Sequence, residues 1–135
     1  MLVDDGLAKP LLIGRREVVH HRLSQLGLRL EENRDYEITD PEDDPRYDEY
    51  WRQYHQVMER KGVSPDAART IIRTNSTAIA ALMLKRREAD AMICGTYGRY
   101  DFHLNYVLNV IGIKEGVRGV TPWEWSSFIE RVWRI

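Results

Sequence analysis

Pro10-Leu11-Leu12-Ile13-Gly14 is an apolar run bounded by a proline and a glycine. Because parallel strands are covered on both faces and need not alternate in polarity, this run predicts a buried strand. Apolar side chains then recur at helical spacing over residues 15–26, until Gly27 ends the pattern. Residues 36–39 alternate in polarity and predict a second strand. Strands separated by a helix predict a right-handed crossover, and therefore an α/β fold with a parallel sheet.

Helices dominate the residues that follow. A long helix is expected over 45–61, with Asp44 as its N-cap and Pro45 at its first position. Ser64-Pro65 predicts the start of another helix, and two more are expected over 77–87 and 101–111. Residues 89–95 predict a third strand that ends in a glycine turn. The long helix carries one apolar and aromatic stripe, more typical of a core than of a ligand platform: Tyr47, Tyr50, Trp51, Tyr54, Val57 and Met58.

The composition is that of one globular domain. The chain has 135 residues, of which 43% are hydrophobic and 30% are charged. No apolar run approaches the roughly 20 residues that cross a bilayer, and no signal peptide is visible at the N-terminus. A single cysteine fits a reducing compartment, so we expect a cytoplasmic protein. The formal charge of −1 gives no reason to expect nucleic acid or a membrane as a partner.

That small net charge hides an asymmetry. Residues 31–49 hold ten acidic side chains against two arginines, so this segment carries −8 and the remainder carries +7. Such a segment is usually a solvated surface, although it can also steer a basic partner.

Side chains with catalytic or metal-binding chemistry form no recognisable pattern. The four histidines, His20, His21, His55 and His103, lack metal-ligand spacing with cysteine or carboxylates. Cys94 ends the predicted third strand and fits a small apolar filler better than a nucleophile. No serine lies in a nucleophile-elbow context. We therefore expect no metal site and no catalytic residue in this chain.

The most site-like stretch is Gly95-Thr96-Tyr97-Gly98-Arg99. In an open α/β sheet, ligands bind beyond the carboxyl ends of the strands, and a glycine-rich loop before a helix presents backbone N–H groups to a phosphate. Arg69 and Arg73 lie four residues apart on one helix face and would widen such a site. The stretch is not a P-loop, because the GK[ST] ending is absent. A plain strand-to-helix turn is the competing interpretation.

Several stretches, taken together, resemble the phosphotransacetylase-like C-terminal domain of bacterial bifunctional NADP-dependent malic enzymes. The resemblance covers about residues 1–118, and its motifs are specific as a set although each is weak alone. They are residues 3–14, residues 41–47 with Tyr50-Trp51 and Tyr54-His55, and residues 89–95 with Gly98-Arg99-Tyr100 and His103-Leu104.

The resemblance implies a partial three-layer, parallel-sheet fold of the isocitrate/isopropylmalate dehydrogenase type. It also implies a regulatory and oligomerisation domain that forms a homo-oligomer and binds acetyl-CoA-like ligands without turnover. NADP and a divalent metal would belong to another domain of the parent enzyme, an oxaloacetate-decarboxylating malate dehydrogenase. A phosphate acetyltransferase parent, or a purely structural assembly fragment, stays open as an alternative.

The sequence also departs from that family. Active phosphotransacetylases carry a Thr-Thr pair in the loop matched by residues 96–102, where this chain has Gly98-Arg99-Tyr100-Asp101. The Ser-Arg pair and the catalytic Asp of the family come from a later region, so we expect a fragment that is not catalytic by itself. Residues 119–135 form a tryptophan-rich tail with apolar side chains at helical spacing, which predicts a short amphipathic helix.

Overall fold

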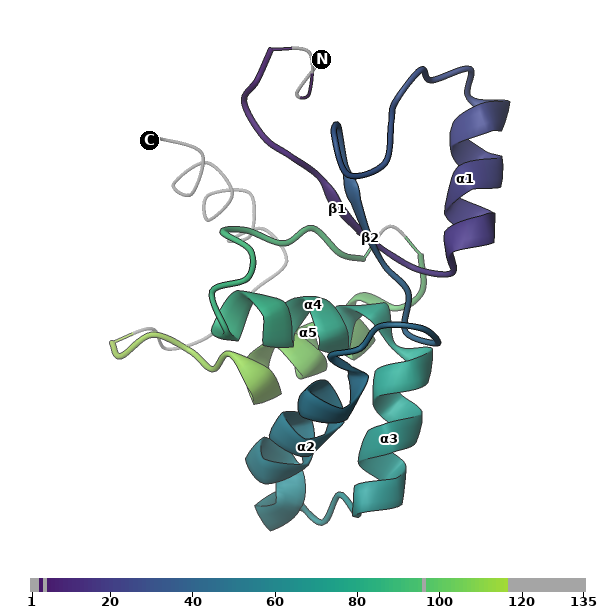
Figure 1. Cartoon of the computed structure of the whole chain (residues 1–135). Helices are drawn as coiled ribbons and strands as arrows, with labels where there is room; N and C mark the ends of the chain where they lie inside the picture. The colour runs from purple at the N-terminus through teal and green to yellow at the C-terminus, as the bar shows by residue number, and fades with distance from the viewer. Residues whose placement is uncertain (1–2, 4, 96, 117–135) are drawn as a thin grey trace.

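The computed structural model describes residues 3, 5–95 and 97–116 (Figure 1). A short parallel sheet and one helix stand above a layer of packed helices. No helix among these residues is long and apolar enough to span a membrane. In chain order the elements are β1 (Leu11–Ile13), α1 (Arg16–Gln25), β2 (Glu37–Thr39), α2 (Tyr47–Met58), the 3₁₀ turn η1 (Glu59–Lys61), α3 (Pro65–Thr74), α4 (Ser76–Lys85) and α5 (Tyr100–Val110).

The predicted strand–helix–strand unit is confirmed. β1 and β2 pair in parallel, with Leu12 opposite Ile38 and Ile13 opposite Thr39, and α1 makes the crossover between them. The pairing continues one step beyond the strands, since the Gly14 N–H donates to the Thr39 carbonyl at 3.0 Å. The α/β class is therefore correct, with a sheet of two short strands in the described part of the chain.

The core lies among the helices below the sheet. Helix α4 is apolar on nearly every face, as its sequence Ser-Thr-Ala-Ile-Ala-Ala-Leu-Met-Leu-Lys dictates, and six of its side chains are buried between α2, α3 and α5. The stripe predicted on α2 is confirmed as core, because Tyr50, Tyr54 and Met58 are buried in the same cluster. This packing fixes the N-terminal end of α4 beneath the sheet.

The predicted third strand, residues 89–95, is wrong. The segment runs from the end of α4 back toward the start of α5, and in the described part of the chain it pairs with no strand. Ile93 is 79% exposed, which a buried parallel strand would not allow. A strand requires a hydrogen-bonding neighbour as well as an apolar sequence, and the described residues provide none for this segment.

The expected N-cap of α2 is also wrong. The helix begins at Tyr47, two residues later than predicted, and its N-cap is Arg46. The Asp44 carboxylate instead accepts hydrogen bonds from the Arg46 main-chain N–H, at 2.7 Å, and from the Arg46 guanidinium. Pro45 and Arg46 therefore form a turn that Asp44 closes before the helix starts.

The acidic segment 31–49 is less solvated than a plain charged surface. Glu32 contacts Arg16 and His20, and its side chain is only 17% exposed. The side chain of Asp44 is 7% exposed beside Arg46. Much of the negative charge is thus paired inside the chain, which leaves less of it to steer a partner.

Candidate functional site

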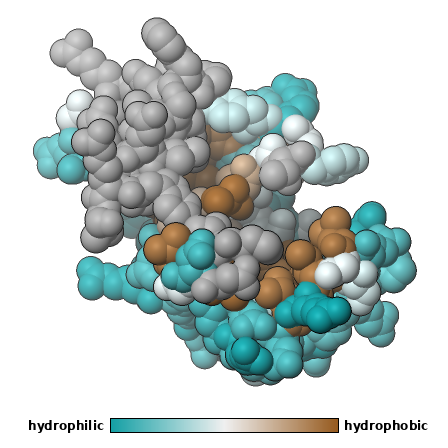
Figure 2. Space-filling view, turned by 90° about the horizontal axis from the view of Figure 1, so that it is seen from above, coloured by the Kyte–Doolittle hydropathy of each residue, from teal (hydrophilic) through white to brown (hydrophobic). Residues whose placement is uncertain are grey.

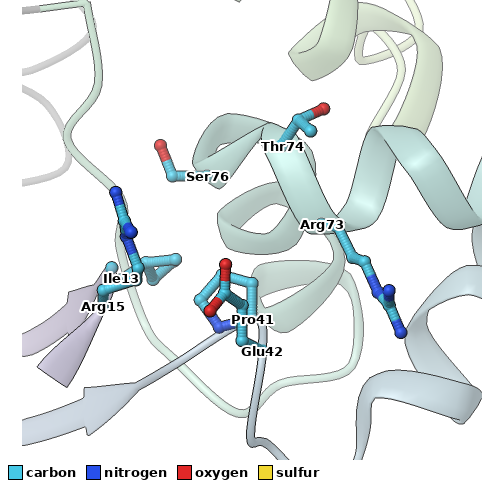
Figure 3. A pocket seen from close by; sticks show the side chains of 8 residues that line it. Ile13, Arg15, Pro41, Glu42, Arg73, Thr74 and Ser76 are labelled. Atoms are coloured by element: carbon cyan, nitrogen blue, oxygen red, sulfur yellow. The ribbon is translucent and has the colours of Figure 1, made fainter.

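A groove of about 490 Å³ opens where β1 and β2 end (Figure 3). Parallel strands bring their carboxyl ends to one edge of a sheet, and the chain leaving each strand diverges there. The groove is completed from below by the end of α3 and the start of α4. Its lining residues are Ile13, Gly14, Arg15, Pro41, Glu42, Arg73, Thr74 and Ser76.

Arg15 is a positively charged residue of the groove. It directly follows the Gly14 turn after β1, and in the described part of the chain no carboxylate pairs with it. Figure 3 shows its side chain rising on the same side of the groove as the Ser76 hydroxyl. The Glu42 carboxylate lies across from them, so the groove presents both charges.

The N-terminus of α1 does not add an anion site to this groove. The main-chain N–H of Arg16 donates to the Asp40 carboxylate at 2.9 Å, and the same carboxylate accepts from the Glu42 N–H at 3.0 Å. Asp40 thus ties the turn after β2 to the start of α1 and occupies the position where an anion would bind. A negatively charged ligand would meet Arg15 and α4 instead.

A glycine loop (Gly95 and Tyr97–Arg99) leads into α5 beside the same end of α4. Gly95 and Gly98 have φ angles of +90° and +91°, a region that other residues rarely enter. His103 on α5 holds the loop, because its Nε2 lies 2.6 Å from the Tyr97 carbonyl. Its Nδ1 lies 2.7 Å from the hydroxyl of Thr77, the neighbour of Ser76 in α4. Groove and loop therefore meet at the first turn of α4.

The other predicted site residues lie around these two features. Arg99 is 84% exposed at its side chain and pairs with Asp101 at 2.7 Å, which lowers the pKa of that carboxyl. Arg73 lines the groove, but its guanidinium lies over the Tyr47 ring at 4.9 Å and points away from the cavity (Figure 3). Arg69 packs over Trp51 at 4.2 Å, one helical turn earlier. Thr96 lies outside the described residues, as does the predicted helical tail.

Sequence reasoning missed Arg15, Ser76 and the Thr77–His103 pair. Arg15 had a usable signal, because it follows the predicted strand at the edge where ligands bind. The Thr77–His103 contact joins residues 26 apart in the chain, and no local pattern encodes it.

The groove brings a cation, a hydroxyl and a carboxylate to one edge of the sheet. Burial raises the pKa of the Cys94 thiol, which keeps it protonated at neutral pH. In the described residues no three histidine, cysteine or acidic side chains gather as metal ligands would. An arginine and a hydroxyl beside the start of α4 are groups suited to phosphate recognition.

Comparison with known proteins decides the family. The profile of the phosphate acetyl/butaryl transferase family matches residues 1–124. The chain belongs to this family. The match extends a few residues further than the resemblance read from the sequence, which ended near residue 118. This phosphate acetyl/butaryl transferase family member includes both the groove and the glycine loop within the matched region.

Malic enzymes are among its relatives. The chain is 50% identical to the NAD-dependent malic enzyme of Rhizobium meliloti over 117 residues, which cover 87% of the chain and 15% of that protein. It is 49% identical to the NADP-dependent malic enzyme of Escherichia coli over 116 residues, 86% of the chain and again 15% of the enzyme. A phosphate acetyltransferase of Clostridium acetobutylicum is 25% identical over 120 residues, 89% of the chain and 35% of the enzyme. The resemblance to the phosphotransacetylase-like region of malic enzymes is confirmed, and the chain spans only 15% of the length of these two malic enzymes.

Proposed function

We propose that this chain is a regulatory and assembly region of an NADP-dependent malic enzyme that binds acetyl-CoA-like ligands without turnover. The main support for this proposal is the groove at the carboxyl ends of the strands, where Arg15 has no carboxylate partner among the described residues. The chain is also related to malic enzymes. We propose binding without turnover because Gly98-Arg99-Tyr100-Asp101 stand where active phosphotransacetylases carry a Thr-Thr pair.

Coenzyme A suits the site because its phosphates are anionic and compact. In the proposed complex, Arg15 and the Ser76 hydroxyl bind one phosphate, while the glycine loop and Arg99 approach from the other side of the first turn of α4. Glu42 excludes a second phosphate from the opposite wall of the groove by like-charge repulsion. NADP and the divalent metal of the parent enzyme belong elsewhere in this proposal.

We infer that the two-stranded sheet is part of a larger parallel sheet of the isocitrate/isopropylmalate dehydrogenase type, in a cytoplasmic homo-oligomer. Parallel sheets are normally covered on both faces and contain more than two strands. Large apolar side chains are exposed on this chain, including Leu7 at 71% and Ile93 at 79%, and Figure 2 shows apolar residues at the surface of one face. Further strands and subunits would bury such groups.

Calorimetric titration of the 135-residue chain with acetyl-CoA tests the proposal. We expect binding by the wild type and an affinity about tenfold lower for Arg15→Ala and for Arg99→Ala, since each removes a charge-assisted contact. Arg60→Ala is the matched control, because Arg60 lies in η1 away from the groove and should leave the affinity unchanged.

Two results would refute it. Formation of acetyl phosphate from acetyl-CoA and phosphate by this chain would show an active acyltransferase. No heat of binding with acetyl-CoA, coenzyme A or acetyl phosphate would leave a purely structural role.

A further inference from the structure

We propose that His103 is a positioning residue that fixes the glycine loop against the first turn of α4, which also lines the groove. The consequence for ligand binding rests on the proposed function. The positioning itself rests on contacts that are independent of any ligand: the imidazole joins the loop to α4 through both of its ring nitrogens.

The partners of His103 determine its tautomer. A backbone carbonyl only accepts hydrogen bonds, so the nitrogen that faces the Tyr97 carbonyl, Nε2, must carry a proton. In the neutral ring Nδ1 is then an acceptor, and it takes the hydroxyl proton of Thr77. Both bonds are satisfied together in the Nε2–H tautomer. Thr77 is 3% exposed, so this hydroxyl has little access to water as an alternative partner.

The two glycines are packed against the same ring. A Cβ built on Gly98 would lie 3.3 Å from Nε2 of His103, and one on Gly95 would lie 4.0 Å from its Cδ2. Larger residues at these positions would therefore meet the imidazole as well as an unfavourable φ angle. Phe102 contacts the ring edge-on, with centroids 5.9 Å apart. The imidazole therefore limits the side chains that fit at positions 95 and 98 of the loop.

This arrangement gives the loop one orientation relative to the groove. Thr77 follows Ser76 directly, so a bond from His103 to Thr77 ties the loop to the residue next to the groove wall. A fixed loop presents its main-chain N–H groups to a ligand without the entropic cost of ordering them on binding. His103 then raises the affinity through the loop, without touching the ligand itself.

The test uses the full chain, labelled with ¹⁵N, and two pairs of variants. His103→Phe keeps a planar ring and removes both bonds, and His21→Phe on the exposed face of α1 is its control. Thr77→Val removes the hydroxyl with little change of shape, and Thr77→Ser restores it. Ring ¹⁵N shifts report the tautomer, backbone order parameters of Gly95, Tyr97 and Gly98 report the loop, and titration with acetyl-CoA reports affinity.

We expect the Nε2–H tautomer in the wild type and loop order parameters of about 0.85, falling below about 0.6 in His103→Phe. Acetyl-CoA affinity should fall about fivefold or more in His103→Phe and Thr77→Val, and Thr77→Ser should restore it. An Nδ1–H tautomer, or an equally ordered loop in folded His103→Phe, would overturn the positioning role. A loosened loop with unchanged affinity would overturn its consequence for binding. If the wild type binds no acetyl-CoA, the proposed function fails, while the tautomer and the order parameters still decide the role of His103.

Discussion

Tyr50 is a buried aromatic residue whose hydroxyl meets a cluster of charges. It donates a 2.6 Å hydrogen bond to Glu88, which also pairs with Arg46 and Arg86. The two guanidinium groups lie 5.5 and 5.3 Å from the centre of the Tyr50 ring. Burial, followed by the bond to Glu88, raises the pKa of the Tyr50 hydroxyl and keeps it a donor at every ordinary pH. One phenol thus links α2 to the residues that follow α4.

Replacing Tyr50 by phenylalanine tests this link. The variant keeps the ring and its cation–π contacts but leaves Glu88 without its hydroxyl donor. Hydrogen bonds to charged groups contribute about 1.5–3 kcal/mol, and we expect the free energy of unfolding to fall by about that amount. Urea denaturation measures it, with Tyr97→Phe as the control because Tyr97 is 91% exposed. Equal losses in both variants would contradict the role of the buried hydroxyl.

At the scale of single elements, α3 shows most clearly how sequence sets structure. Ser64 is its N-cap, with Pro65 at the first helical position, as predicted. The Ser64 hydroxyl accepts from the Ala67 N–H at 3.2 Å, which satisfies one of the four free donors of the helix start. α3 and α4 then follow each other with only Asn75 between them, and Asn75 caps α4 in the same way.

Ser64→Ala should therefore weaken α3 without disturbing the core. Loss of an N-cap costs about 1 kcal/mol, and Ser64→Asp should retain the stability because aspartate caps equally well. Urea denaturation of the two variants measures the difference. Ser24 lies on exposed α1 and caps no helix, so Ser24→Ala is the control. Equal stability of Ser64→Ala and Ser64→Asp would show that Pro65 alone starts the helix.

Elements that depend on the sequence of their own segment were predictable, whereas features that depend on residues far away in the chain were not. Both strands of the crossover and the helices expected over 15–26, 45–61, 77–87 and 101–111 follow from periodicity and are present, although the helices begin and end up to three residues from the expected bounds. The segment 89–95 has the apolar composition of a strand, but pairing depends on which residues lie beside it. The N-cap of α2 is Arg46 rather than the expected Asp44. The Asp44 carboxylate instead accepts a hydrogen bond from the main-chain N–H of Arg46, two residues later in the chain. At the site, Arg15 was missed although its place directly after a strand was a usable signal, whereas the bond between Thr77 and His103 depends on the packing of α5 against α4.

For the whole molecule, the cluster around Glu88 makes stability depend on pH. Burial opposes ionisation of Asp44, but hydrogen bonds from Arg46 outweigh it and lower its pKa below the ordinary 3.8. Burial likewise opposes ionisation of Glu88, but Tyr50 and Arg86 lower its pKa below 4.5. A carboxyl with a depressed pKa stabilises the fold above its ordinary pKa and loses that contribution as the pH falls through the lowered value.

We therefore expect the free energy of unfolding to fall as the pH is lowered from neutral to about 3. Urea denaturation across that range measures it in the wild type and in Glu88→Gln. The amide in this variant has no charge to lose, so the variant should start less stable and show a shallower decline. A variant curve parallel to that of the wild type would mean that other carboxylates cause the acid sensitivity.

Helices α4 and α5 are tied to each other at both ends, by Thr77 to His103 and by Lys85 to the Val110 carbonyl at 2.8 Å. Matching ends are joined, so the two helices run in the same direction (Figure 1). Their backbone dipoles therefore add rather than cancel, and each contributes about half a positive charge at its N-terminal end. Parallel dipoles repel each other, and the two ties offset that repulsion. The peptide groups of these two helices therefore add a positive contribution to the electrostatic potential at the end of the molecule where the groove and the glycine loop lie.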